Sequence, residues 1–203
     1  MDKKIERTMK NLSNRGFLTE CFSTKEELKA HLLKEIDSEV SIGIGGSMTI
    51  KELGLYEELI NRGNTVYWHW EVPKKERVET FVKARDADLY FTSSNGLIEN
   101  GVLLNIDGVG NRVSAMFSGP KKVFFVVGVN KISENEKAAL NRIKNIACPL
   151  NAKRLGLKTP CGVSGKCTDC FHEDRMCNIT VKLERSPKLL EQRVYIVGEE
   201  MGY

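Results

Sequence analysis

Residues 40–70 read VSIGIGGSMTIKELGLYEELINRGNTVYWHW, and this stretch decides the fold class. Residues 40–44 form a short apolar run typical of a buried strand, and a glycine-rich loop follows them. Residues 48–63 carry a helical pattern that ends at Gly63, and residues 65–70 return to a strand pattern. A strand, a helix and a second strand in this order are typical of a parallel sheet.

Helices and strands alternate along the rest of the chain as well. Further helices are predicted at 3–16, 23–36, 74–87, 110–119 and 133–147, and further strands at 88–94, 101–106, 121–129, 178–184 and 193–199. The run 121–129, KKVFFVVGV, is the most strand-like of all. We therefore expect an α/β fold, a three-layer sandwich in which helices cover both faces of a mostly parallel sheet.

Length and composition indicate one globular domain. The 203 residues are 41% apolar and 29% charged, which excludes a disordered chain. We expect a single domain over 1–203, with N-terminal helices in 1–38, an α/β core in 39–157 and 178–203, and a cysteine-rich segment in 158–177.

Charge and hydropathy limit the partners. The net charge of +4 is scattered, which suits a small anionic ligand and gives no basic stripe for nucleic acid. No apolar run reaches the ~20 residues of a membrane span. The opening MDKKIERTMKNL lacks the apolar core of a secretory signal, so we expect a cytoplasmic protein with reduced cysteines. Association into a homo-oligomer is left open.

The glycine loop after the first strand is a candidate anion site. Gly45 and Gly46 would let the backbone approach a ligand, while Met48 opens the helix and Ser47 and Thr49 add hydroxyl groups. Free N–H groups at a helix start favour phosphate or carboxylate. The alternative is a tight turn in which Ser47 only caps the helix.

A second polar cluster follows the strand at 88–94. Ligands of α/β sheets bind at the carboxyl ends of strands, where this cluster is expected to lie. Glu99 and Asp107 are candidate acids or bases, and Arg112 could clamp an anion in bidentate fashion. The other candidates for binding are Asn95, Asn111, Asn130 and Lys131. The alternative is that Asp107 and Asn111 only brace turns.

The long middle stretch makes a family resemblance visible. GIGGSMTIKELG, SSNGLIENGVLLNIDGVGNRVSAMFSGPKKVFFVVGVNKI and PLNAKRL resemble the lactate-utilisation (LUD) domain family, from about residue 5 onward. The resemblance implies a fold like the ribose-5-phosphate isomerase, glucosamine-6-phosphate deaminase and CoA-transferase superfamily. It also implies that the loop 43–49 receives a phosphate or acyl group, and that iron–sulfur and flavin-type oxidoreductases are partners in bacterial growth on lactate. The catalytic motif of the isomerases is missing from this chain.

Residues 161–177, CGVSGKCTDCFHEDRMC, hold four of the six cysteines. Cys167 and Cys170 could grip one metal ion, and Cys161 and Cys177 could complete four thiolates for zinc or an iron–sulfur cluster. A reversible Cys167–Cys170 disulfide and four unliganded thiols are the alternatives. Cys148 lies beside Pro149 at a helix break and could approach this group.

Three hypotheses for function follow. The first is a LUD-domain protein that binds a small anionic or phosphorylated metabolite and serves lactate or related organic-acid metabolism. The second is a sugar-phosphate isomerase or acyl-CoA transferase that uses Glu99 or Asp107. The third is a non-catalytic subunit that docks to an iron–sulfur oxidoreductase through the cysteine segment.

Overall fold

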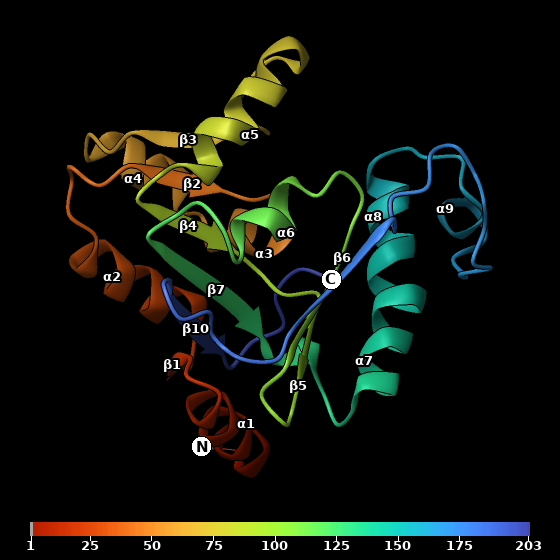
Figure 1. Ribbon diagram of the computed structural model, residues 1–203, viewed down its shortest axis with the longest axis horizontal. Coiled ribbons are helices and arrows are strands. Elements are labelled where there is room, and N and C mark those ends of the chain that lie inside the picture. The colour runs from red at the N-terminus through yellow and green to blue at the C-terminus, as the bar shows by residue number, and fades with distance from the viewer. Residues whose placement is uncertain (1) are drawn as a thin grey trace.

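A six-stranded sheet forms the centre of the computed structural model, which describes residues 2–203 (Figure 1). Every pair of neighbouring strands in it is parallel, in the order β1–β10–β7–β4–β2–β3. The strands are β1 (Leu18–Phe22), β2 (Ile42–Ile44), β3 (Val66–Trp68), β4 (Leu89–Thr92), β7 (Lys122–Gly128) and β10 (Glu191–Val197). Of the domain predicted over 1–203, only position 1 lies outside the described residues.

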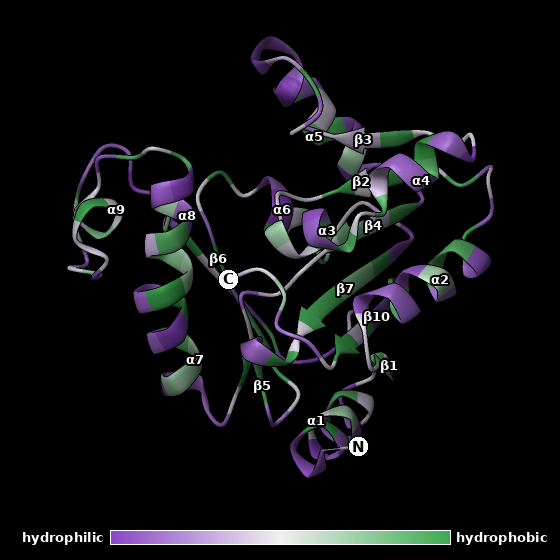
Figure 2. Ribbon diagram, turned by 180° about the vertical axis from the view of Figure 1, so that it is seen from behind, coloured by the Kyte–Doolittle hydropathy of each residue, from purple (hydrophilic) through white to green (hydrophobic). Residues whose placement is uncertain are grey.

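Strand β7 explains why the sheet is covered on both sides. Val123, Phe125 and Val127 pack into the core on one face, and Phe124 and Val126 into the core on the other. All five are 2% exposed or less. A strand that buries both faces needs a helical layer on each, as parallel sheets generally do. Figure 2 shows β7 and its neighbours as the most hydrophobic part of the fold.

Two sets of helices supply these layers and confirm the predicted three-layer α/β sandwich. One face is covered by α1 (Lys3–Asn14), α5 (Arg77–Arg85, after a 3-10 turn at Lys74–Glu76) and α6 (Asn111–Ala115). The other is covered by α2 (Lys25–Glu35), α3 (Met48–Leu53) and α4 (Tyr56–Asn61).

A second, four-stranded sheet stands beside the first. Its order is β8–β5–β6–β9, and only β5 and β8 pair in parallel. It consists of β5 (Gly96–Ile98), β6 (Leu103–Asp107), β8 (Ile132–Ser133, after a 3-10 turn at Val129–Lys131) and β9 (Ile179–Leu183). Its apolar side packs on a long helical column, at the right of Figure 1. The column comprises α7 (Glu136–Arg142), a π-helical turn (Ile143–Ala147) and α8 (Cys148–Arg154), and α9 (Pro160–Ser164) follows.

Several elements differ from the sequence-based expectation. The helix predicted at 48–63 is two helices, because Gly54 adopts a left-handed φ of 64° and ends α3. The helix predicted at 133–147 continues to Arg154 through the π-helical turn. Pro149 has no N–H and crowds the carbonyl four residues earlier, and a wider turn relieves that clash. Strands β1 and β5 are not predicted at all.

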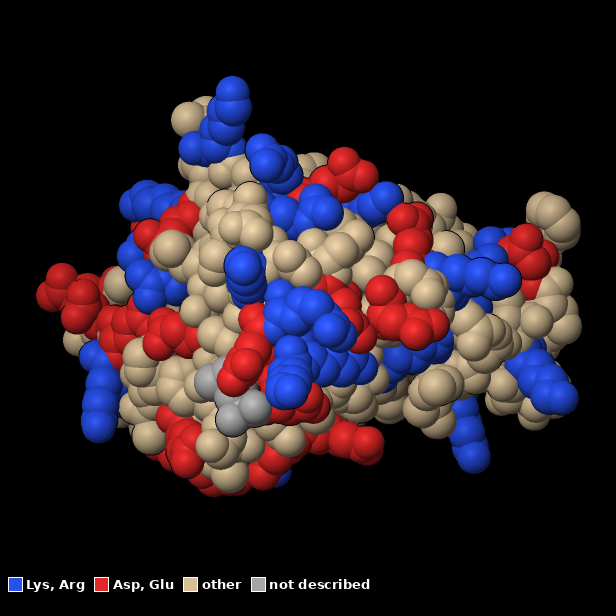
Figure 3. Space-filling view, turned by 90° about the horizontal axis from the view of Figure 1, so that it is seen from below, with Lys and Arg blue, Asp and Glu red and all other residues tan. Residues whose placement is uncertain are grey.

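Within residues 2–203, no helix is both long and apolar enough to cross a bilayer. On the face in Figure 3, lysines and arginines are interspersed with aspartates and glutamates. That face therefore presents no broad region of a single charge.

Candidate functional site

A cleft of about 330 Å³ lies at the carboxyl ends of the parallel strands, where ligands of α/β sheets bind. The segments that follow β2, β3, β4 and β7 all contribute to it, and α8 closes it from the other side. Nine of the predicted site residues line it: Gly46, Ser47, Met48, Thr49, Asn95, Asp107, Asn111, Arg112 and Lys131. The structure thus brings the glycine loop and the second polar cluster together.

The glycine loop serves packing as well as the cleft. A Cβ atom at Gly45 would lie 2.8 Å from the Tyr90 hydroxyl and 3.0 Å from Cγ of Arg112, so only glycine fits there. The Ser47 Oγ accepts a hydrogen bond from the Ile50 N–H at 3.3 Å and caps α3. The alternative interpretation of Ser47 as a helix cap is therefore correct, although the residue also lines the cleft.

Arg112 is a buried structural hub and not an open clamp. Its Nη1 donates to the Ser93 carbonyl at 3.0 Å and to Asn105 Oδ1 at 2.9 Å. Its Nη2 donates to Asn95 Oδ1 and to the Ile106 carbonyl, both at 2.9 Å, and its Nε pairs with Asp107 Oδ2 at 3.2 Å. Its four Nη hydrogens are thus held by hydrogen bonds, and its Nε–H faces the Asp107 carboxylate. These contacts with the protein leave Arg112 no free pair of donors for the bidentate clamp that the sequence suggests.

Both carboxylate oxygens of Asp107 are likewise engaged by contacts within the protein. Its Oδ1 accepts hydrogen bonds from the backbone N–H groups of Val109 at 3.1 Å and Gly110 at 2.7 Å, and its Oδ2 faces Arg112. The carboxylate thus braces the turn into α6, as an Asx turn does. Its side chain is 8% exposed, so its oxygens have little room to serve as an acid or base.

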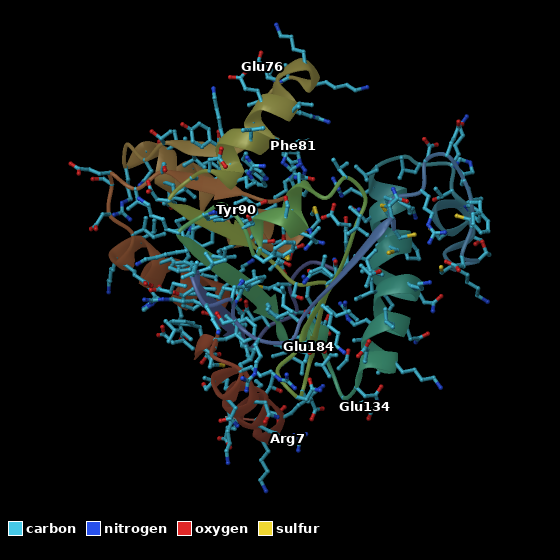
Figure 4. All side chains as sticks on the ribbon, viewed as in Figure 1. Arg7, Glu76, Phe81, Tyr90, Glu134 and Glu184 are labelled. Atoms are coloured by element: carbon cyan, nitrogen blue, oxygen red, sulfur yellow. The ribbon has the colours of Figure 1, made fainter. Side chains whose placement is uncertain are left out.

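Two predicted residues lie apart from the cleft. The Glu99 carboxylate pairs with Arg7 of α1, which lies at the opposite end of the molecule from the cleft residue Phe81 (Figure 4). The Asn130 amide donates to the Gly202 carbonyl at 3.2 Å, and its Oδ1 accepts from the Met201 N–H at 3.2 Å. Asn130 therefore anchors residues 201–202, and Glu99 anchors α1.

Lys131 is the buried lysine of the cleft. It lies at the end of the 3-10 turn that follows β7, and it is 3% exposed. Its Nζ donates to Thr49 Oγ1 at 2.5 Å and to Ser93 Oγ at 2.9 Å. Burial, followed by the charges of Arg142 and Arg112, lowers the pKa of the Lys131 ammonium to about 7.

The structure adds residues at the cleft that the sequence did not single out. His69 and Trp70 follow β3, Arg77 and Phe81 come from α5, and Arg154 ends α8. The ring of His69 packs edge-on against Phe81 at 4.7 Å. The guanidinium of Arg154 lies 4.7 Å from the centre of a Trp70 ring, in a cation–π contact. The sequence places His69 and Trp70 inside the strand predicted at 65–70, whereas β3 ends at Trp68 and leaves both residues at the carboxyl edge of the sheet.

Two exposed arginines, Arg77 and Arg154, contribute to a lowered pKa of His69 in the cleft. The pKa of His69 falls to about 4, mainly through burial and then through Arg77 and Arg154, while Asp107 opposes the shift. His69 is consequently neutral at physiological pH. The charges of both arginines disfavour a proton on its ring, and the carboxylate of Asp107 favours one.

Protein contacts hold the cysteine segment in place. The Arg175 guanidinium donates to the Cys170 carbonyl at 2.5 Å and to the Cys177 carbonyl at 3.2 Å, and it pairs with Asp169 at 3.2 Å. Met176 lines the cleft, and the Asn151 amide of α8 donates to its sulfur at 3.1 Å. The segment therefore forms part of the cleft wall.

The six cysteines are all free thiols of intermediate exposure. Cys148 also lines the cleft, and its thiol pKa is raised to about 12 by burial and by the neighbouring Cys177, Cys161 and Cys167. Cys148 thus approaches the cysteine segment, as its position beside Pro149 suggested. Within residues 2–203, however, no three His, Cys, Asp or Glu side chains are arranged to hold a metal ion.

Comparisons with known proteins bear on the family and on the fold. The family model described as LUD domain matches residues 5–197. No curated protein matches the chain. The crystal structure of a DUF162 family protein from Deinococcus radiodurans is similar over 97% of each chain, with 13% sequence identity and a TM-score of 0.56. At that identity the likeness concerns the fold alone.

The hub role of Arg112 predicts a large loss of stability in Arg112→Lys. A lysine cannot serve five acceptors, so buried carbonyl and amide oxygens would lose their donors, at a cost of about 3 kcal/mol. Urea denaturation measures this difference. Arg85→Lys is the matched control, since Arg85 pairs with Asp86 at an exposed surface and should cost less than ~1 kcal/mol. Equal losses in the two variants would contradict the hub role.

The buried Lys131 predicts a pH-dependent stability difference in Lys131→Met. The wild-type pKa is about 7 when folded and ~10.4 when unfolded, so the wild type loses stability as the pH falls from about 10 to 7. The Met variant lacks this dependence. Its stability relative to the wild type should therefore rise by more than ~1 kcal/mol between pH 10 and pH 7. Urea denaturation across this range checks it, and parallel pH profiles would refute the assigned environment.

Proposed function

The chain belongs to the LUD domain family, and on that premise we propose that its cleft binds a small anionic metabolite, a carboxylate or a phosphate ester. The role of the protein would be in lactate or related organic-acid metabolism, as the family name indicates. A volume of about 330 Å³ suits a ligand of that size.

The positive charge of the side chains that line the cleft is the observation that supports this proposal. Arg77 and Arg154 line the cleft together with the Arg112–Asp107 pair, which leaves an excess of positive charge. Within residues 2–203, no carboxylate forms an ion pair with Arg77, Arg154 or Lys131. Cations in a concave, partly apolar site attract anions and hold them by charge-assisted hydrogen bonds.

Neither of the predicted acid–base residues supports the isomerase or transferase hypothesis. Glu99 pairs with Arg7 away from the cleft, and both oxygens of Asp107 are bound to Arg112 and to its own turn. Binding of an anion therefore has more support than acid–base catalysis by these carboxylates.

Arginine variants test the anion site. With L-lactate, pyruvate and inorganic phosphate as probes, at least one should raise the melting temperature of the wild-type protein. Arg77→Gln and Arg154→Gln should each weaken that binding about tenfold, which corresponds to ~1.4 kcal/mol. Lys74→Gln, an exposed change one turn before α5, is the control and should leave the affinity unchanged. No stabilisation by any probe would reject the anion site.

We propose as a second function that the cysteine segment binds zinc or an iron–sulfur cluster and docks to an oxidoreductase subunit. The observation that favours docking is that Phe171 is 100% exposed and Val163 is 80% exposed within this segment. Both apolar side chains are therefore accessible to a partner protein. Four cysteine ligands, Cys161, Cys167, Cys170 and Cys177, suit either metal centre by number and type. The side chains would have to rearrange on binding.

Metal analysis of protein purified without oxygen tests this second function. We expect one equivalent of zinc, or iron with labile sulfide and a visible absorption band. Cys167→Ser should lower the metal content, and Cys21→Ser, on the distant strand β1, should not. Protein free of zinc, iron and sulfide would reject the metal proposal.

A further inference from the structure

The side-chain amine of Lys131 lies in surroundings that favour its action as a nucleophile. We infer that its amine forms an imine with the carbonyl carbon of a small aldehyde or ketone that also carries a carboxylate or phosphate. This inference rests on the proposed anion site for the second group of the substrate. It assigns to Lys131 a covalent step that goes beyond the binding of an anion.

The hydrogen bonds around the amine leave one position free. Thr49 Oγ1 donates its own proton to the Met201 carbonyl at 3.2 Å, and Ser93 Oγ donates to the Ser94 carbonyl at 3.3 Å. Both hydroxyls can therefore only accept from Lys131. A neutral amine has two N–H donors, and these two hydroxyls occupy both of them. The nitrogen lone pair is then the part of the group left for a ligand.

The charges that face Lys131 favour this neutral amine. Within residues 2–203 it forms no ion pair, although most buried lysines are paired. Arg142 of α7 and Arg112 of α6 disfavour a second positive charge, and Glu52 of α3 opposes them more weakly. Arg142 is itself held at the Asn130 carbonyl, 2.7 Å from its Nε. Burial beside other cations is an established way to activate a lysine amine.

The reaction balances without a further reagent. The Lys131 nitrogen attacks the carbonyl carbon, and a C–N bond forms while the carbonyl oxygen takes up a proton. The carbinolamine then loses its oxygen as water, which carries the two protons that the amine gives up. No electrons are transferred, so the step needs no oxidant or reductant. The hydroxyls of Thr49 and Ser93 hold the amine in position for the attack, and these hydrogen bonds are released as the nitrogen gives up its protons.

The cleft offers the second contact that such a substrate needs. Arg77 and Arg154 contribute guanidinium groups to the same lining as Lys131. Residues on the aromatic side, Trp70 and Phe81, would shield the carbonyl from water. A carbonyl compound with an acidic group thus matches both the amine and the guanidinium groups of the lining, whereas a simple aldehyde matches the amine alone.

Reductive trapping tests the inference on the whole protein. Pyruvate and glycolaldehyde phosphate are incubated separately with the protein and sodium cyanoborohydride, and the modified peptides are mapped by mass spectrometry. We expect one stable adduct at Lys131 with at least one of the two probes. Lys131→Arg should lose it, and Lys51→Arg, an exposed change on α3, should retain it. Adducts that are confined to exposed lysines with both probes would overturn the inference.

A second measurement needs no variant. Competitive labelling of the wild-type protein with acetic anhydride should titrate Lys131 near pH 7, against ~10.4 for an unperturbed lysine side chain. An ordinary titration of Lys131 would also overturn the inference. If pyruvate or phosphate stabilises the protein through Arg77 and no adduct forms at Lys131, the imine is rejected and the anion site stands. If neither stabilisation nor an adduct is seen, both are rejected.

Discussion

The Arg112 guanidinium joins the two sheets, and the arrangement of the cleft depends on it. Its partners are Ser93 after β4, Asn95 before β5, and Asn105, Ile106 and Asp107 of β6. A buried cation is costly unless all its donors are bound, so these acceptors must stay where they are. The position of β5 and β6 relative to the main sheet is thereby fixed. The absence of a side chain at Gly45 follows from the same constraint, because Cγ of Arg112 fills that space.

The same cation shapes the chemistry of its neighbour. Arg112 pairs with Asp107, the one side-chain carboxylate that lines the cleft within residues 2–203, so this carboxylate competes less with an anionic ligand. The positive charge of Arg112 also disfavours a proton on Lys131, after the larger effects of burial and of Arg142. One arginine therefore occupies one candidate base of the cleft and contributes to the neutral form of another.

The pattern of apolar residues was enough to predict the layers of the fold. It was not enough to predict which side chains contact one another in the cleft. The apolar run of β7 and the alternation of elements were enough for the sandwich, because burial on two faces leaves a clear pattern. Strand β1, with the sequence LTECF, lies at an edge, and its polar residues interrupt the apolar pattern of a buried strand. Strand β5 has three residues, which are too few to show a pattern. Nothing in the sequence shows that the donors of Arg112 are all occupied, or that Arg77 faces a cleft. Such facts arise only from tertiary contacts.

The cleft and the cysteine segment are physically continuous. Met176 and Cys148 line the cleft, and both lie next to Cys177, the first by sequence and the second by packing on the same core cluster. A Cβ atom at Gly108, beside the cleft, would lie 3.0 Å from the Met176 carbonyl oxygen. A movement of Cys148 or Cys177 therefore bears on the cleft wall. If the cysteine segment binds the metal centre proposed for it, linkage requires that the cleft ligand and that centre change each other's affinity by the same factor.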